Sequence, residues 1–229
     1  MVDFQIREKE IFETLKKIKN LRLSVIGGYA VNAYTFPRFS IDCDIVVKNH
    51  EDSEEIGERL IQLGYNESKD ISESPYHGNF KRYVKKISKD FAVSLDILIG
   101  EVLDRQTNAT FSADWIFENS KIRTLKGKTI AEELKLRIIN LDALFVMKIV
   151  SCRSTDIRDI FLLVANIKDK KWVISEISKR YSFENRLKRV KDEITSKQFK
   201  DGLQGVFGKI EDKIFEKHKK FILDLSLRK

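Results

Sequence analysis

Carboxylates interrupt two otherwise apolar segments of this chain that are predicted to form strands. Residues 41–47 begin with Ile-Asp-Cys-Asp and continue as Ile-Val-Val, which predicts a buried β-strand. Side chains alternate between the two faces of a strand, so Asp42 and Asp44 should project from one face and Cys43 from the other. Asp96 interrupts a second apolar strand, predicted over residues 91–99.

Two carboxylates as close as Asp42 and Asp44 repel each other and lose hydration, which destabilises the fold unless a cation lies between them. The alternative is that both acids lie at an exposed strand end, but the apolar residues that follow favour a buried strand. A lone acid such as Asp96 on a core strand needs a partner. That partner is either a metal ion shared with Asp42 and Asp44, or a nearby lysine or arginine. Three carboxylates on neighbouring strands could hold two magnesium ions about 3.5–4 Å apart.

The kind of metal follows from the other potential ligands in the chain. The sequence has two cysteines and three histidines, and none of their spacings resembles a zinc site. Metal binding would therefore use oxygen ligands, which favours Mg²⁺ or Mn²⁺.

A glycine pair, Gly27-Gly28, stands between a short apolar strand over residues 23–26 and a helix predicted over residues 29–36. Glycine allows a tight turn and a close backbone approach to a ligand, and the start of a helix offers N–H groups to a phosphate. A diglycine turn is also common as a purely structural feature. Gly27 and Gly28 are therefore candidates for phosphate binding.

The order of predicted elements indicates the α/β (α+β) fold class. Residues 1–135 alternate short strands and helices, which predicts a small core around a mixed sheet, with further short strands from residue 115 onward. Residues 136–229 contain mainly helical patterns, including a pair over residues 141–152 and 157–167. We therefore expect a C-terminal helical module.

The charge is unevenly distributed along the chain. Residues 168–229 hold 18 lysines and arginines against 10 acidic residues, which accounts for the whole net charge of +8. This basic segment favours an anionic partner, with nucleic acid the first candidate, although a solvated lysine-rich surface would give the same composition. No apolar run approaches the ~20 residues that a membrane span needs, and no signal peptide is evident. We therefore expect a cytoplasmic protein without a membrane partner.

The glycine pair and the acidic strand together resemble the motifs of a known superfamily. Thirteen residues separate Gly27-Gly28 from Asp42-Cys43-Asp44, and this arrangement is similar to the glycine-pair and Asp-x-Asp motifs of the DNA polymerase beta-like nucleotidyltransferases. The resemblance is closest to the AbiEii-type toxin branch, in which the glycine pair is followed by Arg-x-Ser/Thr-x-Asp-x-Asp, as in residues 38–44 of this chain. The resemblance continues in residues 142–160, which contain a helical lysine followed by a segment with arginine and aspartate. The resemblance covers residues 24–167.

The resemblance implies a transferase that moves a nucleoside monophosphate from an NTP, such as ATP, to an acceptor hydroxyl and releases pyrophosphate. It implies that Gly27 and Gly28 cradle the triphosphate and that Asp42 and Asp44 bind the magnesium ions. Asp96 would complete this metal site or act as the base on the acceptor hydroxyl. The fold it implies is a nucleotidyltransferase core followed by a helical module.

Further residues would surround the triphosphate in such an enzyme. The resemblance implies that Lys148 reaches the triphosphate from its helix, and that Arg38 and Ser40 lie near enough to contribute. Asp159 would orient Lys148 or Arg153. The structural alternatives stay open: Lys148 could simply emerge from a helix end, and Arg153 and Asp159 could belong to an intrahelical charge set.

Three functions are compatible with these residues. The AbiEii-type resemblance and the basic C-terminal segment favour an RNA acceptor, such as a tRNA end, and a toxin role restrained by a cognate antitoxin protein. A second possibility is a small hydroxylated acceptor, as in antibiotic nucleotidyltransferases. A third is a non-catalytic module of the same fold that binds a nucleotide or a partner protein, but the presence of all three carboxylates argues against it.

Overall fold

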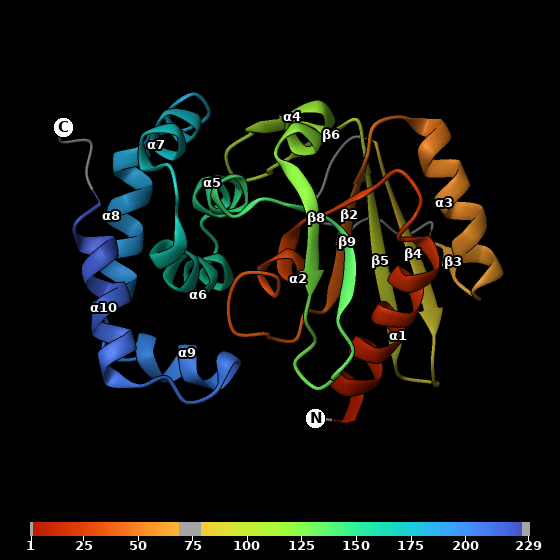
Figure 1. Cartoon of the computed structure of the whole chain (residues 1–229), viewed down its shortest axis with the longest axis horizontal. Coiled ribbons are helices and arrows are strands. Elements are labelled where there is room, and N and C mark those ends of the chain that lie inside the picture. Colours follow the sequence, from red (N-terminus) through yellow and green to blue (C-terminus); the bar gives the residue numbers. More distant parts are fainter. Residues whose placement is uncertain (1, 69–78, 226–229) are drawn as a thin grey trace. The chain divides into compact units, whose positions relative to one another are not determined.

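The computed structural model describes residues 2–68 and 79–225 of the chain, and Figure 1 shows its helices and strands. The chain divides into two compact units, one formed by Met1–Ala33 with Pro37–Asn140 and the other by Tyr34–Phe36 with Leu141–Lys229. The first unit is a mixed α/β core and the second is helical, which confirms the predicted fold class. Residue 135, where the sequence placed the boundary, lies within the last strand of the first unit.

A seven-stranded mixed sheet, built from the described residues, lies at the centre of the first unit in the order β3-β4-β5-β2-β1-β9-β8. Strand β2 runs parallel to β5, and β1 runs parallel to β9, while the other neighbouring strands are antiparallel. The strands of this sheet are β1 (Ser24–Val25), β2 (Asp42–Val47), β3 (Asn66–Glu67), β4 (Phe80–Lys86), β5 (Ala92–Ile99), β8 (Ser120–Leu125) and β9 (Leu134–Ile139). A separate ribbon pairs β6 (Glu101–Leu103) with β7 (Thr110–Ser112).

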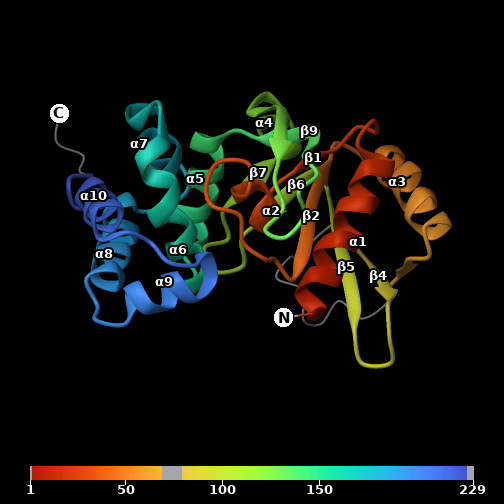
Figure 2. The ribbon, with the colours of Figure 1, turned by 60° about the horizontal axis from the view of Figure 1, so that its bottom comes forward.

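Helices cover the central strands of this sheet. Helices α1 (Val2–Ile18) and α3 (His50–Gln62) contact each other and pack against β5, and they lie side by side in Figures 1 and 2. The short helices α2 (Gly27–Val31) and α4 (Ala113–Glu118) pack against β2. Because apolar residues recur at helical spacing on α1, its inner face is fully buried, and each such side chain contributes roughly 1.5–3 kcal/mol.

The secondary structure predicted for two segments of the first unit was wrong. The helix predicted over residues 29–36 begins earlier, at the glycine pair, and already ends at Val31. The Asn32 side chain accepts a hydrogen bond from Arg38 N (3.0 Å) and donates one to Arg38 O (2.9 Å), which turns the chain back. Residues 113–118 form a helix where strands were expected to begin, because the Ser112 hydroxyl caps it by accepting from Trp115 N.

The second unit consists, in its described part, of six α-helices and one short 3-10 turn. They are α5 (Leu141–Ser151), α6 (Ser154–Leu163), η1 (Val164–Asn166), α7 (Lys170–Ser178), α8 (Phe183–Ile194), α9 (Phe199–Phe207) and α10 (Asp212–Leu223). Phe161, Phe199 and Phe215 from three of these helices form an aromatic cluster with ring centroids 4.9–6.4 Å apart. Among the described residues, no helix has both the length and the apolar character to cross a membrane.

Candidate metal centre

Strands β2 and β5 bring the three predicted acids together. The parallel register places Asp44 directly opposite Asp96, and it places Asp42 opposite Ser94, two residues earlier on each strand. Since side chains two residues apart share a face, all three carboxylates project from the same side of the sheet. One carboxylate oxygen from each of Asp42, Asp44 and Asp96 lies within 4.8 Å of the others. The predicted cluster is therefore present in the structure.

The environment of these acids suits a divalent cation. Asp96 is fully buried and Asp44 is 6% exposed, while Asp42 is partly exposed at the start of β2. Converging buried carboxylates repel each other, and hard oxygen donors are the ligands that Mg²⁺ and Mn²⁺ prefer. Within the described residues, this is the one group of three His, Cys, Asp or Glu side chains with metal-ligand geometry. The donor set therefore fits the predicted metal.

Arg82 is a member of this site that the sequence did not single out. It stands opposite Asp96 on the antiparallel strand β4, where its Nε and Nη2 donate to Asp96 Oδ1 and Oδ2, both at 2.8 Å. The alternation of apolar and basic residues along β4 was visible in the sequence, but the pairing of β4 with β5 was not. Asp96 thus satisfies both predicted alternatives, since it has an arginine partner and also faces Asp42 and Asp44.

The charges of the site shift the pKa values of its members. Burial raises the pKa of the Asp96 carboxyl above its ordinary value; Arg82 opposes this rise and the nearby charge of Asp42 adds to it. The hydrogen bond to Asp96 raises the pKa of Arg82, which also responds to the charges of Asp42 and Asp44. Cys43 points to the other face of the sheet, and burial raises the pKa of its thiol, with further rises caused by the three carboxylates.

The glycine pair lies directly against the acidic cluster. Gly27 has a φ of +64°, and a Cβ at this position would stand 2.0 Å from Asp44 Oδ2. The adjoining backbone is fixed to the same strand, because Ile26 N donates to Asp44 O at 3.0 Å. Only glycine therefore allows the turn to pass this close to the carboxylate without displacing it.

Arg38 and Ser40 lie at the second glycine. A Cβ on Gly28 would stand 2.3 Å from Ser40 Oγ and 3.1 Å from Arg38 Nη2. The Arg38 backbone is anchored by the Asn32 side chain, a contact that was not evident from the sequence. Five of the predicted site residues thus lie around one turn: Gly27, Gly28, Arg38, Ser40 and Asp44.

The remaining predicted residues belong to the helical unit and form a cluster there. Lys148 Nζ lies 2.6 Å from Asp156 Oδ1 and 3.0 Å from Asp159 Oδ2, and its side chain is 11% exposed. Asp156 Oδ2 also accepts from Ser151 Oγ at 2.7 Å and from Arg153 N at 3.1 Å. Burial alone would raise the pKa of Asp156, but the charge and hydrogen bond of Lys148 hold it below its ordinary value. Lys148 is therefore engaged by two carboxylates.

Comparisons with solved structures give distant likenesses. The chain is similar to ANT(2")-Ia in complex with adenylyl-2"-tobramycin, with 14% identity, a TM-score of 0.47, and coverage of 80% of this chain and 100% of the other. It is similar to an H. pylori protein described as a nucleotidyltransferase, with 14% identity, a TM-score of 0.49, and coverage of 96% and 92%. It is similar to the lincomycin-bound lincosamide antibiotic adenylyltransferase LnuA, with 17% identity, a TM-score of 0.43, and coverage of 68% and 95%.

Comparisons of the sequence found no matching family model and no matching curated protein.

Proposed function

We propose that this protein is a Mg²⁺-dependent nucleotidyltransferase, which moves a nucleoside monophosphate from an NTP to an acceptor hydroxyl and releases pyrophosphate. One observation carries this proposal: carboxylate oxygens of Asp42, Asp44 and Asp96 converge within 4.8 Å beside a glycine turn. Acids that converge on one another need a cation, and a glycine turn leaves room for a phosphate chain next to it.

Asp42, Asp44 and Asp96 would hold the metal. When bound, magnesium neutralises the charge that develops on the transferring phosphoryl group and its leaving pyrophosphate. Arg82 grips both oxygens of Asp96 and so fixes the orientation of that carboxylate toward Asp42 and Asp44. This bidentate contact leaves the outer lone pairs of the two oxygens for a ligand.

The turn at Gly27 and Gly28 would receive the triphosphate. A Cβ at either position would collide with Asp44 or Ser40, so the two glycines let the turn lie directly against the side chains that would face the phosphates. Arg38, whose Nη2 borders Gly28, would contribute a guanidinium to the phosphate oxygens, and Ser40 a hydroxyl. The part that the family resemblance gives to Lys148, Arg153 and Asp159 stays a prediction.

For the acceptor we propose RNA, such as a tRNA end. The support is the charge of residues 168–229, with 18 basic and 10 acidic residues, because a cationic surface gains affinity for nucleic acid by releasing counterions. The toxin role and a cognate antitoxin rest on the motif resemblance to the AbiEii-type branch. A small hydroxylated acceptor is the competing outcome of the test.

The test is incubation of the whole protein with Mg²⁺, each labelled NTP in turn, and total RNA. We expect label in RNA, lost in EDTA and in Asp42→Asn, and kept in Asp114→Asn, which removes an exposed acid of α4 that pairs with Lys48. If no RNA were labelled but small hydroxylated compounds stimulated pyrophosphate release, the acceptor would be a small molecule and not RNA. Absence of metal-dependent pyrophosphate release with every NTP and acceptor would reject nucleotidyl transfer.

A further inference from the structure

Arg186 on α8 is buried, and no carboxylate in the described part of the chain forms a salt bridge with it. The residue is 7% exposed, and its Nε is buried with no hydrogen-bond partner among the described residues. None of the salt bridges formed within residues 2–68 and 79–225 includes Arg186. A buried cation costs free energy unless an anion compensates it, so this arginine is a place where an anionic ligand would be favoured.

A second arginine of the same unit shows how such a charge is usually satisfied. Arg180, six residues earlier, donates from Nη1 to Glu176 Oε2 at 2.7 Å and to Glu176 O at 2.9 Å. Arg186 instead lies over the ring of Tyr181, with its Cζ 4.3 Å from the ring centroid. Stacking on an aromatic ring fixes the orientation of a guanidinium but does not neutralise it, so its N–H groups keep their affinity for an anion.

A second arginine, Arg189, stands three residues after Arg186 on α8. Helix α8 packs against α5 and α6, whose junction is the buried Cys152, with a φ of +48°. Burial raises the pKa of the Cys152 thiol, and the charges that oppose this rise are those of Arg186 and then Arg189. The acid at this junction, Asp156, is already held by Lys148 and Ser151. Arg186 and Arg189, three residues apart, occupy neighbouring positions on one face of α8, and Asp156 at the junction is already paired with Lys148.

We infer that Arg186, supported by Arg189, forms an anion-binding site beside the α5–α6 junction that takes a phosphate group of a polyphosphate. A guanidinium fork matches two oxygens of one phosphate, and the stacked ring of Tyr181 presets its plane. The identity of the ligand as polyphosphate rests on the proposed function, which uses an NTP and releases pyrophosphate. The existence of the anion site rests only on the helical unit.

The experiment measures binding of pyrophosphate to the whole protein by calorimetry in EDTA, where the carboxylate cluster holds no metal. We expect the wild type to bind, Arg186→Met to bind at least about tenfold more weakly, and Lys188→Met to bind normally. Lys188 is an exposed cation of the same helix, so it controls for net charge. Arg189→Gln, an exposed position, should weaken binding about threefold and serves if Arg186→Met does not fold.

The melting temperature of Arg186→Met shows whether Arg186 binds a ligand or stabilises the fold. Because Arg186→Met removes a buried charge that has no carboxylate partner within residues 2–68 and 79–225, its melting temperature without ligand should equal or exceed that of the wild type. A lower melting temperature with unchanged pyrophosphate affinity would overturn the inference, as would absence of pyrophosphate binding by the wild type. Weaker binding of a single-stranded RNA oligonucleotide, with pyrophosphate binding unchanged, would make this an RNA-backbone contact and also overturn it.

These outcomes are independent of the test of nucleotidyl transfer. Loss of metal-dependent activity in Asp42→Asn tests the carboxylate cluster of the sheet. Pyrophosphate binding in EDTA tests the Arg186 site of the helical unit. A protein that binds pyrophosphate through Arg186 but transfers no nucleotide would keep the anion site and reject the enzyme.

Discussion

Carboxylates that are largely buried gather in both units of this protein, but they face different partners. In the sheet, Asp42, Asp44 and Asp96 converge on one another, within 4.8 Å. In the helical unit, Asp156 and Asp159 converge on the ammonium of Lys148, at 2.6 and 3.0 Å. Burial of charge therefore does not by itself mark a catalytic site. Three neighbouring carboxylates, of which Asp96 also binds Arg82, offer several oxygen ligands to one metal, whereas the two acids of the helical unit surround a single ammonium.

The two ion pairs of Lys148 limit its availability for a triphosphate. To reach a triphosphate, its ammonium must leave two carboxylates, which costs the free energy of both ion pairs. The geometry of the helical cluster thus supports a role of Lys148 in stability.

The largest effect is expected from Asp44→Asn. Removing one converging carboxylate should lower nucleotidyl transfer about 10⁴-fold, or about 5 kcal/mol, because the metal loses a charged ligand. Thermal stability in EDTA should not fall, since repulsion within the cluster decreases. The rise in melting temperature on adding Mg²⁺ should disappear in this variant.

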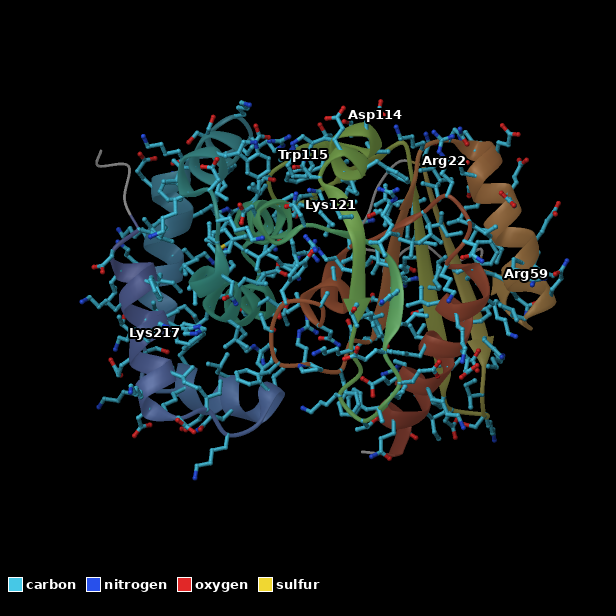
Figure 3. The ribbon with its side chains drawn as sticks, viewed as in Figure 1. Arg22, Arg59, Asp114, Trp115, Lys121 and Lys217 are labelled. Carbon is cyan, nitrogen blue, oxygen red and sulfur yellow. The ribbon has the colours of Figure 1, made fainter. Side chains whose placement is uncertain are left out.

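Asp114→Asn is the matched control, since it removes an exposed carboxylate of α4, labelled in Figure 3. Wild-type activity in Asp44→Asn, at a normal melting temperature, would contradict the metal assignment.

The next effect is a loss of stability in Lys148→Met. This change leaves Asp156 and Asp159 buried without their ammonium, which should lower the free energy of unfolding by about 3–5 kcal/mol. Denaturant unfolding measures the change. Adding Asp156→Asn and Asp159→Asn to the same chain should restore most of the stability.

Activity of this triple variant then decides the role of Lys148. A stable but inactive triple variant would give Lys148 a part in the reaction, and a stable active one would leave it structural. Lys217→Met, at an exposed position of α10 labelled in Figure 3, should change neither property. If Lys148→Met alone were as stable as the wild type, the ion pairs of Lys148 would contribute little to the stability of the helical unit.

A smaller effect should follow from Gly27→Ala. Its Cβ would press on Asp44 Oδ2, so we expect activity to fall about 100-fold through misplacement of that carboxylate. Gly208→Ala is a matched control, since Gly208 also has a positive φ, +89°, but nothing lies within 4 Å of a Cβ there. The positive φ should cost each variant about 1–2 kcal/mol of stability, the collision with Asp44 should add to the loss in Gly27→Ala, and only Gly27→Ala should lose activity. Equal activities would show that the turn does not shape the site.

The smallest effect concerns His218 of the helical unit. Burial lowers the pKa of this imidazole from its ordinary value of 6.5, and Nδ1 lies 2.8 Å from Phe161 O. The unfolded chain therefore binds a proton as pH falls through 6.5 while the folded chain does not, so stability is full above 6.5 and is lost on acidification toward the folded pKa. Melting temperatures of His218→Gln should depend less on pH in this range. An unchanged pH profile would show that His218 does not contribute.

Much of the sheet could be predicted because apolar runs with alternating faces are a local property. Strands β2 and β5 form where the pattern indicated. The end of α2 could not be found in this way, since it depends on Asn32 reaching the backbone of Arg38 six residues later. Helix α4 was missed because its cap, Ser112, outweighs the strand propensity of the aromatic residues that follow.

The sequence by itself determined that Asp42 and Asp44 share a face of one strand and that Asp96 interrupts another, because side-chain direction within a strand follows from spacing alone. Tertiary structure decided that β5 lies beside β2 with Asp96 opposite Asp44, and that Arg82 arrives from β4. It also decided that the glycine turn lies against Asp44. Strand order and register depend on how distant segments bury their apolar faces together, and that choice is not encoded in any single stretch of the chain.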